Sequence, residues 1–191
     1  MKNKGLIILA VVIVLLVSTV GGFIGTYNRL QVLDETVNSQ WAQVENQLQR
    51  RSDLIPNLVN TVKGYATHEK SIFIGVADAR AKLAGAVKQG DIKGINKANA
   101  EFNGSLSRLL AVAENYPQLK ADRNFMALQD EIAGTENRIA VARKDYNESV
   151  KTINGITRTF PTSIIAGMAN IKSREYFQVE ESKTAVPEVK F

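Results

Sequence analysis

Hydrophobic and polar positions divide the chain into one continuous apolar run followed by four amphipathic stretches. The run from Leu6 to Ile24 contains nineteen residues and no charge. After it, apolar residues recur at alternating steps of three and four, which places them on one face of a helix. No stretch alternates apolar and polar residues at every second position, as a half-buried strand does. The pattern therefore predicts an all-α protein.

The first amphipathic stretch covers about residues 30–65, and Arg51 occupies one position where its apolar series calls for a hydrophobic residue. That series is Leu30, Val37, Trp41, Val44, Leu48, Ile55, Leu58, Val62 and Tyr65. Further helices are expected over residues 71–88, 92–115 and 122–160, the last with Asp122 as its N-cap and Phe160 as its final apolar position. Pro117 and Pro161 end the third and fourth helices. Short connections between four such helices predict an antiparallel four-helix bundle with long first and fourth helices.

The apolar run is long enough to cross a membrane. At about 1.5 Å per residue it spans roughly 29 Å, close to the hydrocarbon thickness of a bilayer. A cleaved signal peptide is the competing interpretation, although no Ala-x-Ala site is present and no cysteine follows for lipidation. Gly21 and Gly25 form a small-xxx-small pair, which indicates either contact between two membrane helices or a flexible end of the span. Lys2 and Lys4 before the span, against Arg29 after it, place the bundle on the non-cytoplasmic side.

Composition narrows the chemistry that is available. The 191 residues contain no Cys, which excludes disulfides and thiolate metal sites. The net charge is +5; without Lys2 and Lys4, 24 basic residues become 22, against 19 acidic ones. This excess is too small for a nucleic-acid-binding surface. His68 is the only histidine, which rules out a His–His metal site. We expect it to be a solvated loop residue, which leaves no histidine for a serine triad. No phosphate-binding glycine loop occurs, so no cofactor is expected.

The register of the two long helices predicts a partner for Arg51. If Leu30 lies level with Ile156 in antiparallel helices, Arg51 lies level with Thr135 and Glu136, and Trp41 with Asp145 and Tyr146. A half-buried arginine costs several kcal/mol without a partner, so we expect an Arg51–Glu136 ion pair. Pro56 removes one backbone donor from the first helix and predicts a bend there, although a hinge is the alternative.

The chain also resembles the LemA family of bacterial membrane-anchored proteins. The matching residues lie between positions 27 and 177 and include Trp41, Val44–Glu45, Gln47–Leu48, Arg50–Arg51, Asp53–Val59, Tyr116–Pro117, Glu136–Ile139, Ala142–Arg143, Asp145–Asn147, Phe160–Thr162 and Tyr176–Phe177. The resemblance implies one membrane anchor followed by a bundle of long helices. It implies no enzyme activity.

One charged cluster carries the candidate functional residues. Its members come from the two long helices and are Arg50, Arg51, Asp53, Glu136, Arg138, Arg143 and Asp145. Carboxylates beside arginines could perform acid–base chemistry. The spacing, however, places Glu136 with Arg143 on one face and Arg138 with Asp145 on another, which favours ion pairs within the bundle or contacts with a partner. We therefore predict structural and interaction roles and no catalytic residue.

The predicted organisation has four parts. Residues 1–5 form a short basic start, residues 6–26 the transmembrane anchor, residues 27–177 the bundle, and residues 178–191 a flexible tail. Within the bundle, the apolar segment 160–171 is too short to span a membrane. It can fold back onto the helices, pack on a neighbouring subunit or dip into the bilayer surface, and the first two are favoured.

The predicted function is that of a non-enzymatic scaffold at the bacterial inner membrane. One helix would hold it in the bilayer, and the bundle would self-associate into a homo-oligomer or dock other envelope proteins. Nucleic acids and small-molecule substrates are not expected as partners. The alternative functions are a sensory or regulatory module that relays a signal to an envelope protein, and a hydrolase that uses the charged cluster.

Overall fold

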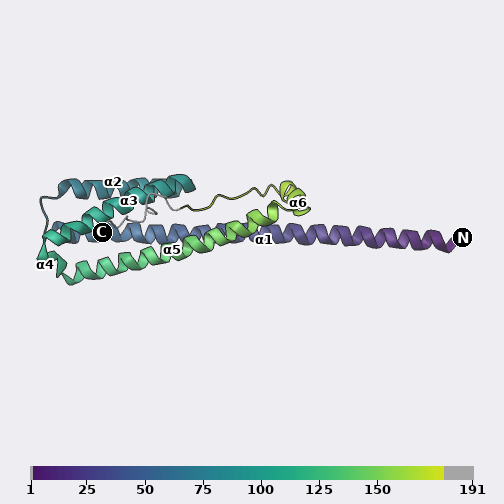
Figure 1. The fold of residues 1–191 in the computed structure, drawn as a ribbon, viewed down its shortest axis with the longest axis horizontal. Coiled ribbons are helices and arrows are strands. Elements are labelled where there is room, and N and C mark those ends of the chain that lie inside the picture. The colour runs from purple at the N-terminus through teal and green to yellow at the C-terminus, as the bar shows by residue number, and fades with distance from the viewer. Residues whose placement is uncertain (1, 179–191) are drawn as a thin grey trace, which may run out of the picture. The chain divides into compact units, whose positions relative to one another are not determined.

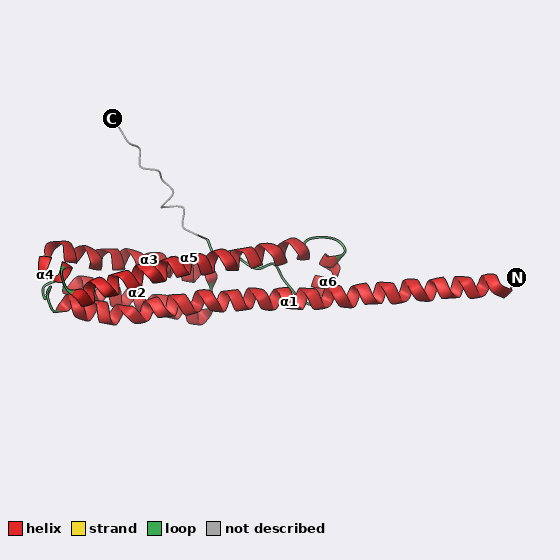
Figure 2. Ribbon diagram, turned by 90° about the horizontal axis from the view of Figure 1, so that it is seen from below, coloured by secondary structure: helices red, strands yellow, loops and turns green. Residues whose placement is uncertain are grey.

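The computed structural model describes residues 2–178, all of them helical or irregular. The described part contains seven helical elements and no strand (Figures 1 and 2), which confirms the all-α prediction. The elements are α1 (Lys2–Lys63), α2 (Lys70–Gln89), α3 (Ile92–Val112), the 3-10 helix η1 (Ala113–Asn115), α4 (Pro117–Lys120), α5 (Arg123–Thr157) and α6 (Thr162–Met168). Most of the predicted tail lies outside the described residues.

Helix α1 joins the apolar run and the first amphipathic stretch in one helix of 62 residues. Gly21 and Gly25 both lie inside it, and the helix runs through both glycines without a break. The roles expected for the two glycines, contact with a second membrane helix or a flexible end of the span, stay predictions. Pro56 also lies inside α1, which continues to Lys63. The N-terminal part is long and apolar enough to cross a membrane and has no buried face. It fits a membrane anchor.

Close contacts divide the molecule into two compact units, and α1 and α5 each contribute to both. The first unit contains α1 up to Gln40 and the segment Glu148–Arg174, which includes the end of α5 and all of α6. The second unit contains Trp41–Asn147 and the described residues from Glu175 on. Each unit has its own buried side chains.

The core of the second unit is built from one face of each of its helices. Within it, α2 and α3 pack along each other (Figure 1), and Ala79 of α2 and Ala98 of α3 are buried. Small side chains allow two helices to come close together. The largest fully buried side chains of this unit are Leu48, Ile55, Leu58, Leu83, Ile95, Phe102, Leu109, Leu119, Phe125 and Ile139.

Two adjacent residues make the turn between α2 and α3. Gly90 ends α2 with φ +68°, a left-handed conformation that favours glycine. Asp91 then caps α3, because its carboxylate accepts hydrogen bonds from the backbone N–H groups of Lys93 and Gly94. A Cβ at position 94 would lie 2.7 Å from an Asp91 carboxylate oxygen. The expected end of one helix near residue 88 and start of the next at residue 92 are thus confirmed.

The core of the first unit lies where α6 packs onto α1. Leu30 is fully buried, and Ile165 and Ala166 of α6 are buried against it. Ile156 at the end of α5 packs on the same cluster. The expected level of Leu30 with Ile156 is confirmed, and so is the expectation that the segment after Pro161 folds back onto the helices.

Two positions assigned to apolar faces are solvent-exposed, so those assignments are wrong. Tyr65 follows the end of α1 and is 40% exposed. Phe160 is 81% exposed, because α5 already ends at Thr157. Pro161 disfavours helical geometry at Phe160, and the chain turns before α6 starts at Thr162. A 3.6-residue pattern cannot show where a helix stops when the apolar series continues past its end.

Asp122 caps α5, as predicted, and its ionisation is linked to stability. The backbone N–H of Phe125 donates to its carboxylate at 2.9 Å, and so does the Tyr65 hydroxyl at 2.9 Å. These two hydrogen bonds, the backbone one foremost, lower the pKa of Asp122. The stabilisation is therefore present above the unfolded pKa of about 4 and is lost as the pH falls through the lower folded pKa.

We expect Asp122→Asn, which keeps an acceptor but no charge, to unfold at lower temperature than the unchanged chain at neutral pH. The difference should shrink once the pH falls below about 4. Thermal unfolding of the detergent-solubilised chain, followed by circular dichroism across this range, measures it. A difference that does not depend on pH would contradict the linkage.

Candidate functional site

The centre of the charged cluster is a buried arginine held by a carboxylate. In the second unit, Arg51 of α1 donates from its guanidinium to Glu136 of α5. The Arg51 side chain is 5% exposed and that of Glu136 is 44% exposed. A second arginine, Arg143, lies 3.6 Å from the other oxygen of Glu136 and is 15% exposed. The ion pair predicted from the helix register is thus present.

One buried and one partly buried guanidinium group therefore share one carboxylate that reaches water. Burial is the main cause that lowers the pKa of Arg51; Glu136 opposes this shift and Arg143 adds to it. Burial also lowers the pKa of Arg143, and the negative charge of Glu136 opposes this shift. Arginine begins so far above neutrality that both side chains stay protonated near pH 7. The cluster is a fixed positive site, which suits holding an anionic group or a helix register better than transferring protons.

Aromatic rings complete the surroundings of both arginines. The Arg51 guanidinium carbon lies 5.3 Å from the centroid of the Phe102 ring on α3. The Arg143 guanidinium carbon lies 5.0 Å from that of Phe177. Both distances are within the range of cation–π attraction. The Nε atoms of both arginines are buried without a hydrogen-bond partner, so ring faces supply part of the stabilisation that water would give.

The other predicted residues lie nearer the surface of the same unit. Arg50 is 60% exposed and pairs with Glu131 at 2.9 Å, and Arg138 binds the same Glu131 oxygen at 2.8 Å. Asp53 is 3.7 Å from Arg80. Asp145 is exposed. The structure thus brings Arg51, Glu136 and Arg143 together and separates them from Arg50 and Arg138, which meet at Glu131; the interaction roles of all these residues stay predictions.

The irregular segment after α6 is fixed by a side-chain amide of α5. In the second unit, the Asn147 side chain accepts from the backbone N–H of Phe177 at 2.8 Å and donates to its carbonyl at 2.9 Å. The Tyr146 hydroxyl donates to the carbonyl of Glu175 at 2.8 Å. The Trp41 ring is tilted against both neighbouring rings, and its centroid lies 5.2 Å from that of Tyr146 and 6.2 Å from that of Phe177. The level of Trp41 with Tyr146 matches the predicted register.

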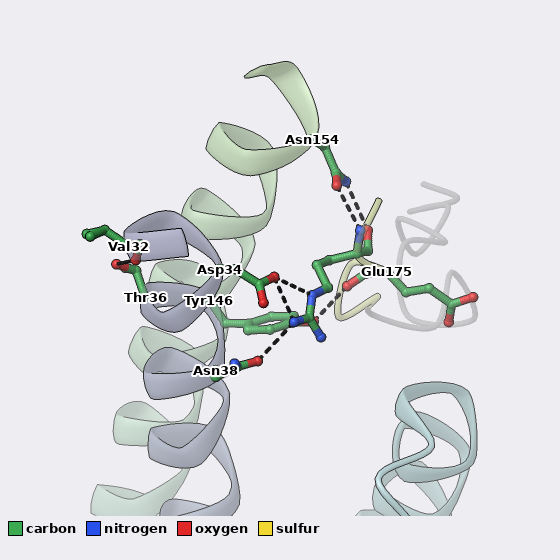
Figure 3. A network of polar contacts seen from close by, with 8 residues as sticks. Val32, Asp34, Thr36, Asn38, Tyr146, Asn154 and Glu175 are labelled. Atoms are coloured by element: carbon green, nitrogen blue, oxygen red, sulfur yellow. Dashed lines mark hydrogen bonds and ion pairs between the residues drawn. The ribbon is translucent and has the colours of Figure 1, made fainter. Parts of the chain in front are cut away.

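The same amide pattern occurs in the first unit at Asn154. Its side chain accepts from the backbone N–H of Arg174 at 2.8 Å and donates to its carbonyl at 2.9 Å. The Arg174 guanidinium reaches α1, where it donates to Asp34 at 2.7 Å and to Asn38 at 3.1 Å. Asp34 and Asn38 lie one turn apart on α1 and point toward the same group (Figure 3). One arginine therefore ties the irregular segment to α1.

Sequence reasoning missed several of these residues as members of networks. They are Asp34, Asn38, Phe102, Glu131, Asn154, Arg174 and Phe177. Of these residues, only Phe177 is named under Sequence analysis, and only within the family resemblance. A signal was present for the amide pattern: Asn147 and Asn154 are seven residues apart, on one face of α5. Nothing in the sequence of residues 171–178 showed which backbone groups they would bind.

The arrangement offers no coordinated set of reactive groups in the part of the chain that the structure describes. No group of three or more His, Asp or Glu side chains there is placed to hold a metal ion. His68 is exposed in the turn between α1 and α2. What the charged cluster offers is a set of ion pairs, some of them between helices that are distant in sequence. Two of the pairs join an arginine with little exposure to the half-exposed Glu136.

Comparison with known proteins identifies the family. The sequence model described as "LemA family" matches residues 40–191. The chain is 30% identical to "Magnetosome protein MamQ 2" of Paramagnetospirillum magneticum, over 86% of the chain and 71% of the relative. It is 27% identical to "Magnetosome protein MamQ" of Magnetospirillum gryphiswaldense, over 90% and 71%. It is 21% identical to "Protein LemA" of Metamycoplasma hominis, over 83% and 72%. The chain belongs to the LemA family.

Proposed function

We propose that this protein is a non-enzymatic scaffold of the bacterial cell membrane. Its N-terminal helix would cross the bilayer, and its helical part would self-associate or dock other proteins. The observation that carries the proposal is α1, a single helix that continues from the apolar run Leu6–Ile24 into the amphipathic series up to Lys63. A membrane helix that continues directly into a packing surface holds that surface at the membrane.

The architecture we propose for the helical part is an antiparallel four-helix bundle made by α1, α2, α3 and α5. In the second unit, the pairs Trp41–Tyr146, Arg51–Glu136 and Tyr65–Asp122 support it. Residue numbers in α1 and the turn after it increase along this series, while residue numbers in α5 and at its N-cap decrease. Figure 2 also draws α1, α2, α3 and α5 alongside one another in this unit.

Exposed charges support a role in contacts. Arg50, Glu131 and Arg138 form ion pairs at the surface, and exposed pairs of this kind contribute little to stability, about 0–1 kcal/mol. They can exchange their present partners for those of another protein at small cost. The names of the relatives refer to the family or to the magnetosome, and none specifies a reaction, which supports a contact role over an enzymatic one.

The proposed location is the inner membrane, with the bundle on the non-cytoplasmic side. Lys2 and Lys4 on one side of the span and Arg29 on the other support this orientation. A reporter fused to the C-terminus that is active only outside the cytoplasm should give signal. Signal from a cytoplasm-specific reporter would reverse the orientation without affecting the scaffold proposal.

Cross-linking of the full chain in its native membrane tests the scaffold. We expect cross-linked species of at least two chains, or of the chain with a second protein, and a size above that of the monomer after mild detergent extraction. A chain that is strictly monomeric and purifies without any partner would refute the proposal.

A variant pair locates the self-association within the span. A Cβ at Gly21 or Gly25 would meet nothing within 4 Å, so this face of α1 is open to a second helix. If the face is used, leucine at both positions should weaken cross-linking, whereas Gly22→Leu, one residue along the helix, should not. Equal cross-linking in both variants would assign self-association to the helical part outside the membrane.

A signal-relay module is the second candidate, because Pro56 lies within the helix that continues from the span. A proline lacks the N–H that closes one helical hydrogen bond, so a helix can bend there at low cost. If relay depends on such bending, Pro56→Ala should abolish the response of the partner protein while cross-linking is retained. A variant with unchanged response would leave the scaffold as the function.

A further inference from the structure

Three exposed apolar side chains lie on α6 or just before it, in the first unit. Phe160, Ile164 and Met168 are 81%, 58% and 71% exposed. Ile164 and Met168 are one turn apart on α6, and Phe160 lies in the turn that precedes α6. The opposite face of α6, with Ile165 and Ala166, is buried. The buried apolar face of α6 packs on its own protein. The exposed apolar face is available to a second apolar partner.

The position of α6 along α1 indicates which partner its exposed apolar face contacts. Ile165 and Ala166 pack on Leu30, and both views draw α6 beside α1 (Figures 1 and 2). Leu30 is four residues beyond Thr26, the end of the predicted span, which is about 6 Å along a helix. The headgroup layer on each side of a bilayer is about 5–8 Å thick. When α1 crosses the membrane, α6 is therefore held at the level of the headgroups.

The charges near α6 match a lipid surface. Residues 149–174 contain Lys151, Arg158, Lys172 and Arg174 and no acidic residue. Arg174 is bound to Asp34, whereas Arg158 and Lys172 are exposed on either side of α6. Lys and Arg close to a membrane are attracted by anionic lipids. Tyr27, 39% exposed near the end of the span, is of a type enriched at membrane interfaces.

We propose that α6 is a second membrane contact. Phe160, Ile164 and Met168 insert among the headgroups of the bilayer that α1 crosses, and Arg158 and Lys172 lie beside anionic lipid phosphates. The inference rests on the membrane anchor proposed above. A membrane-crossing α1 and a surface contact by α6 together restrict how the first unit tilts on the membrane. A single membrane helix leaves that tilt free.

Single cysteines report this contact, since the chain contains none of its own. Three full-length variants, Ile164→Cys, Ser39→Cys and Val14→Cys, each carry an environment-sensitive fluorophore and are placed one chain per bilayer nanodisc. The discs contain phosphatidylcholine and phosphatidylglycerol, with a nitroxide quencher attached to the lipid at headgroup or mid-chain depth. Ser39 is exposed and belongs to the same unit, but it lies about 20 Å beyond Thr26 along the helix. Val14 reports the span itself.

We expect the headgroup quencher to act on the Ile164 label at least about twofold more strongly than on the Ser39 label. The mid-chain quencher should act on Val14. Quenching at Val14 combined with equal, weak quenching at Ile164 and Ser39 would overturn the α6 contact and leave the anchor intact. Absence of quenching at Val14 would overturn both. Shielding of Ile164 only when two chains share a disc would assign this face to a second copy.

The charge contribution has its own test. In the Ile164→Cys chain, Arg158→Gln together with Lys172→Gln should reduce headgroup quenching by about twofold in discs rich in phosphatidylglycerol. In discs of phosphatidylcholine alone, the same substitutions should change little. Equal quenching with and without the two charges in the anionic discs would overturn the role of Arg158 and Lys172.

Discussion

Replacement of Arg51 by alanine is expected to destabilise the helical part by roughly 2–4 kcal/mol. The side chain is 5% exposed and contacts Phe102 and Glu136. Its removal leaves a void along the aliphatic stem and takes away one cation that neutralises Glu136. Because Glu136 is 44% exposed and stays near Arg143, the remaining carboxylate is partly solvated. We therefore expect the free energy of unfolding to fall by less than the largest losses observed when a fully buried ion pair is broken.

Two further variants separate the loss of the Arg51 charge from the loss of its packing. Arg50→Ala, at a side chain that is 60% exposed, should change the free energy of unfolding by no more than about 0.5 kcal/mol. Arg51→Met keeps most of the volume without the charge and should lose much less than Arg51→Ala. Unfolding of the detergent-solubilised chain, followed by circular dichroism, measures all three. Equal shifts for Arg51→Ala and Arg50→Ala would show that Arg51 is not buried between the helices.

Phe102→Ala should have the largest effect of any single change considered, roughly 3–5 kcal/mol. Phe102 is fully buried on α3, and its ring faces the Arg51 guanidinium. Alanine leaves a cavity and removes the ring face that lies against a buried cation. Phe102→Leu fills most of the space and should cost less, roughly 1–2 kcal/mol.

A double-mutant cycle between Phe102→Leu and Arg51→Met isolates the cation–π term. We expect a coupling energy of about 0.5–2 kcal/mol, because the pair is shielded from water. Unfolding midpoints and slopes in denaturant provide the four free energies of the cycle. Effects that add within the error of the measurement would mean that the ring acts on Arg51 only by filling space.

The parts of this fold that the sequence predicts are those that obey a helical period. Leu30, Val44, Leu48 and Ile55 recur at helical spacing and are all buried. Their register against α5 also predicts the Arg51–Glu136 pair, since a charge within an apolar face needs a partner at the same level. Gly90 and Asp91 mark a turn because each residue type favours a helix end for its own backbone reason.

The missed parts depend on contacts that have no local signature. Residues 171–178 have no period, and their backbone groups find partners in Asn147 and Asn154, twenty or more positions away. Phe160 continues an apolar series, yet the helix has already ended. The continuity of α1 through Gly21 and Gly25 was also missed, because a glycine weakens a helix without determining its end.

The scaffold and the α6 contact both require that the mature chain keeps its N-terminal helix. Membranes from cells that make the native protein, washed with alkaline carbonate, separate integral from peripheral proteins. The intact mass of the recovered chain then shows whether Leu6–Ile24 is still attached. We predict a chain of full length that stays in the membrane pellet. A mature chain in the soluble fraction, shortened by these residues, would contradict the account.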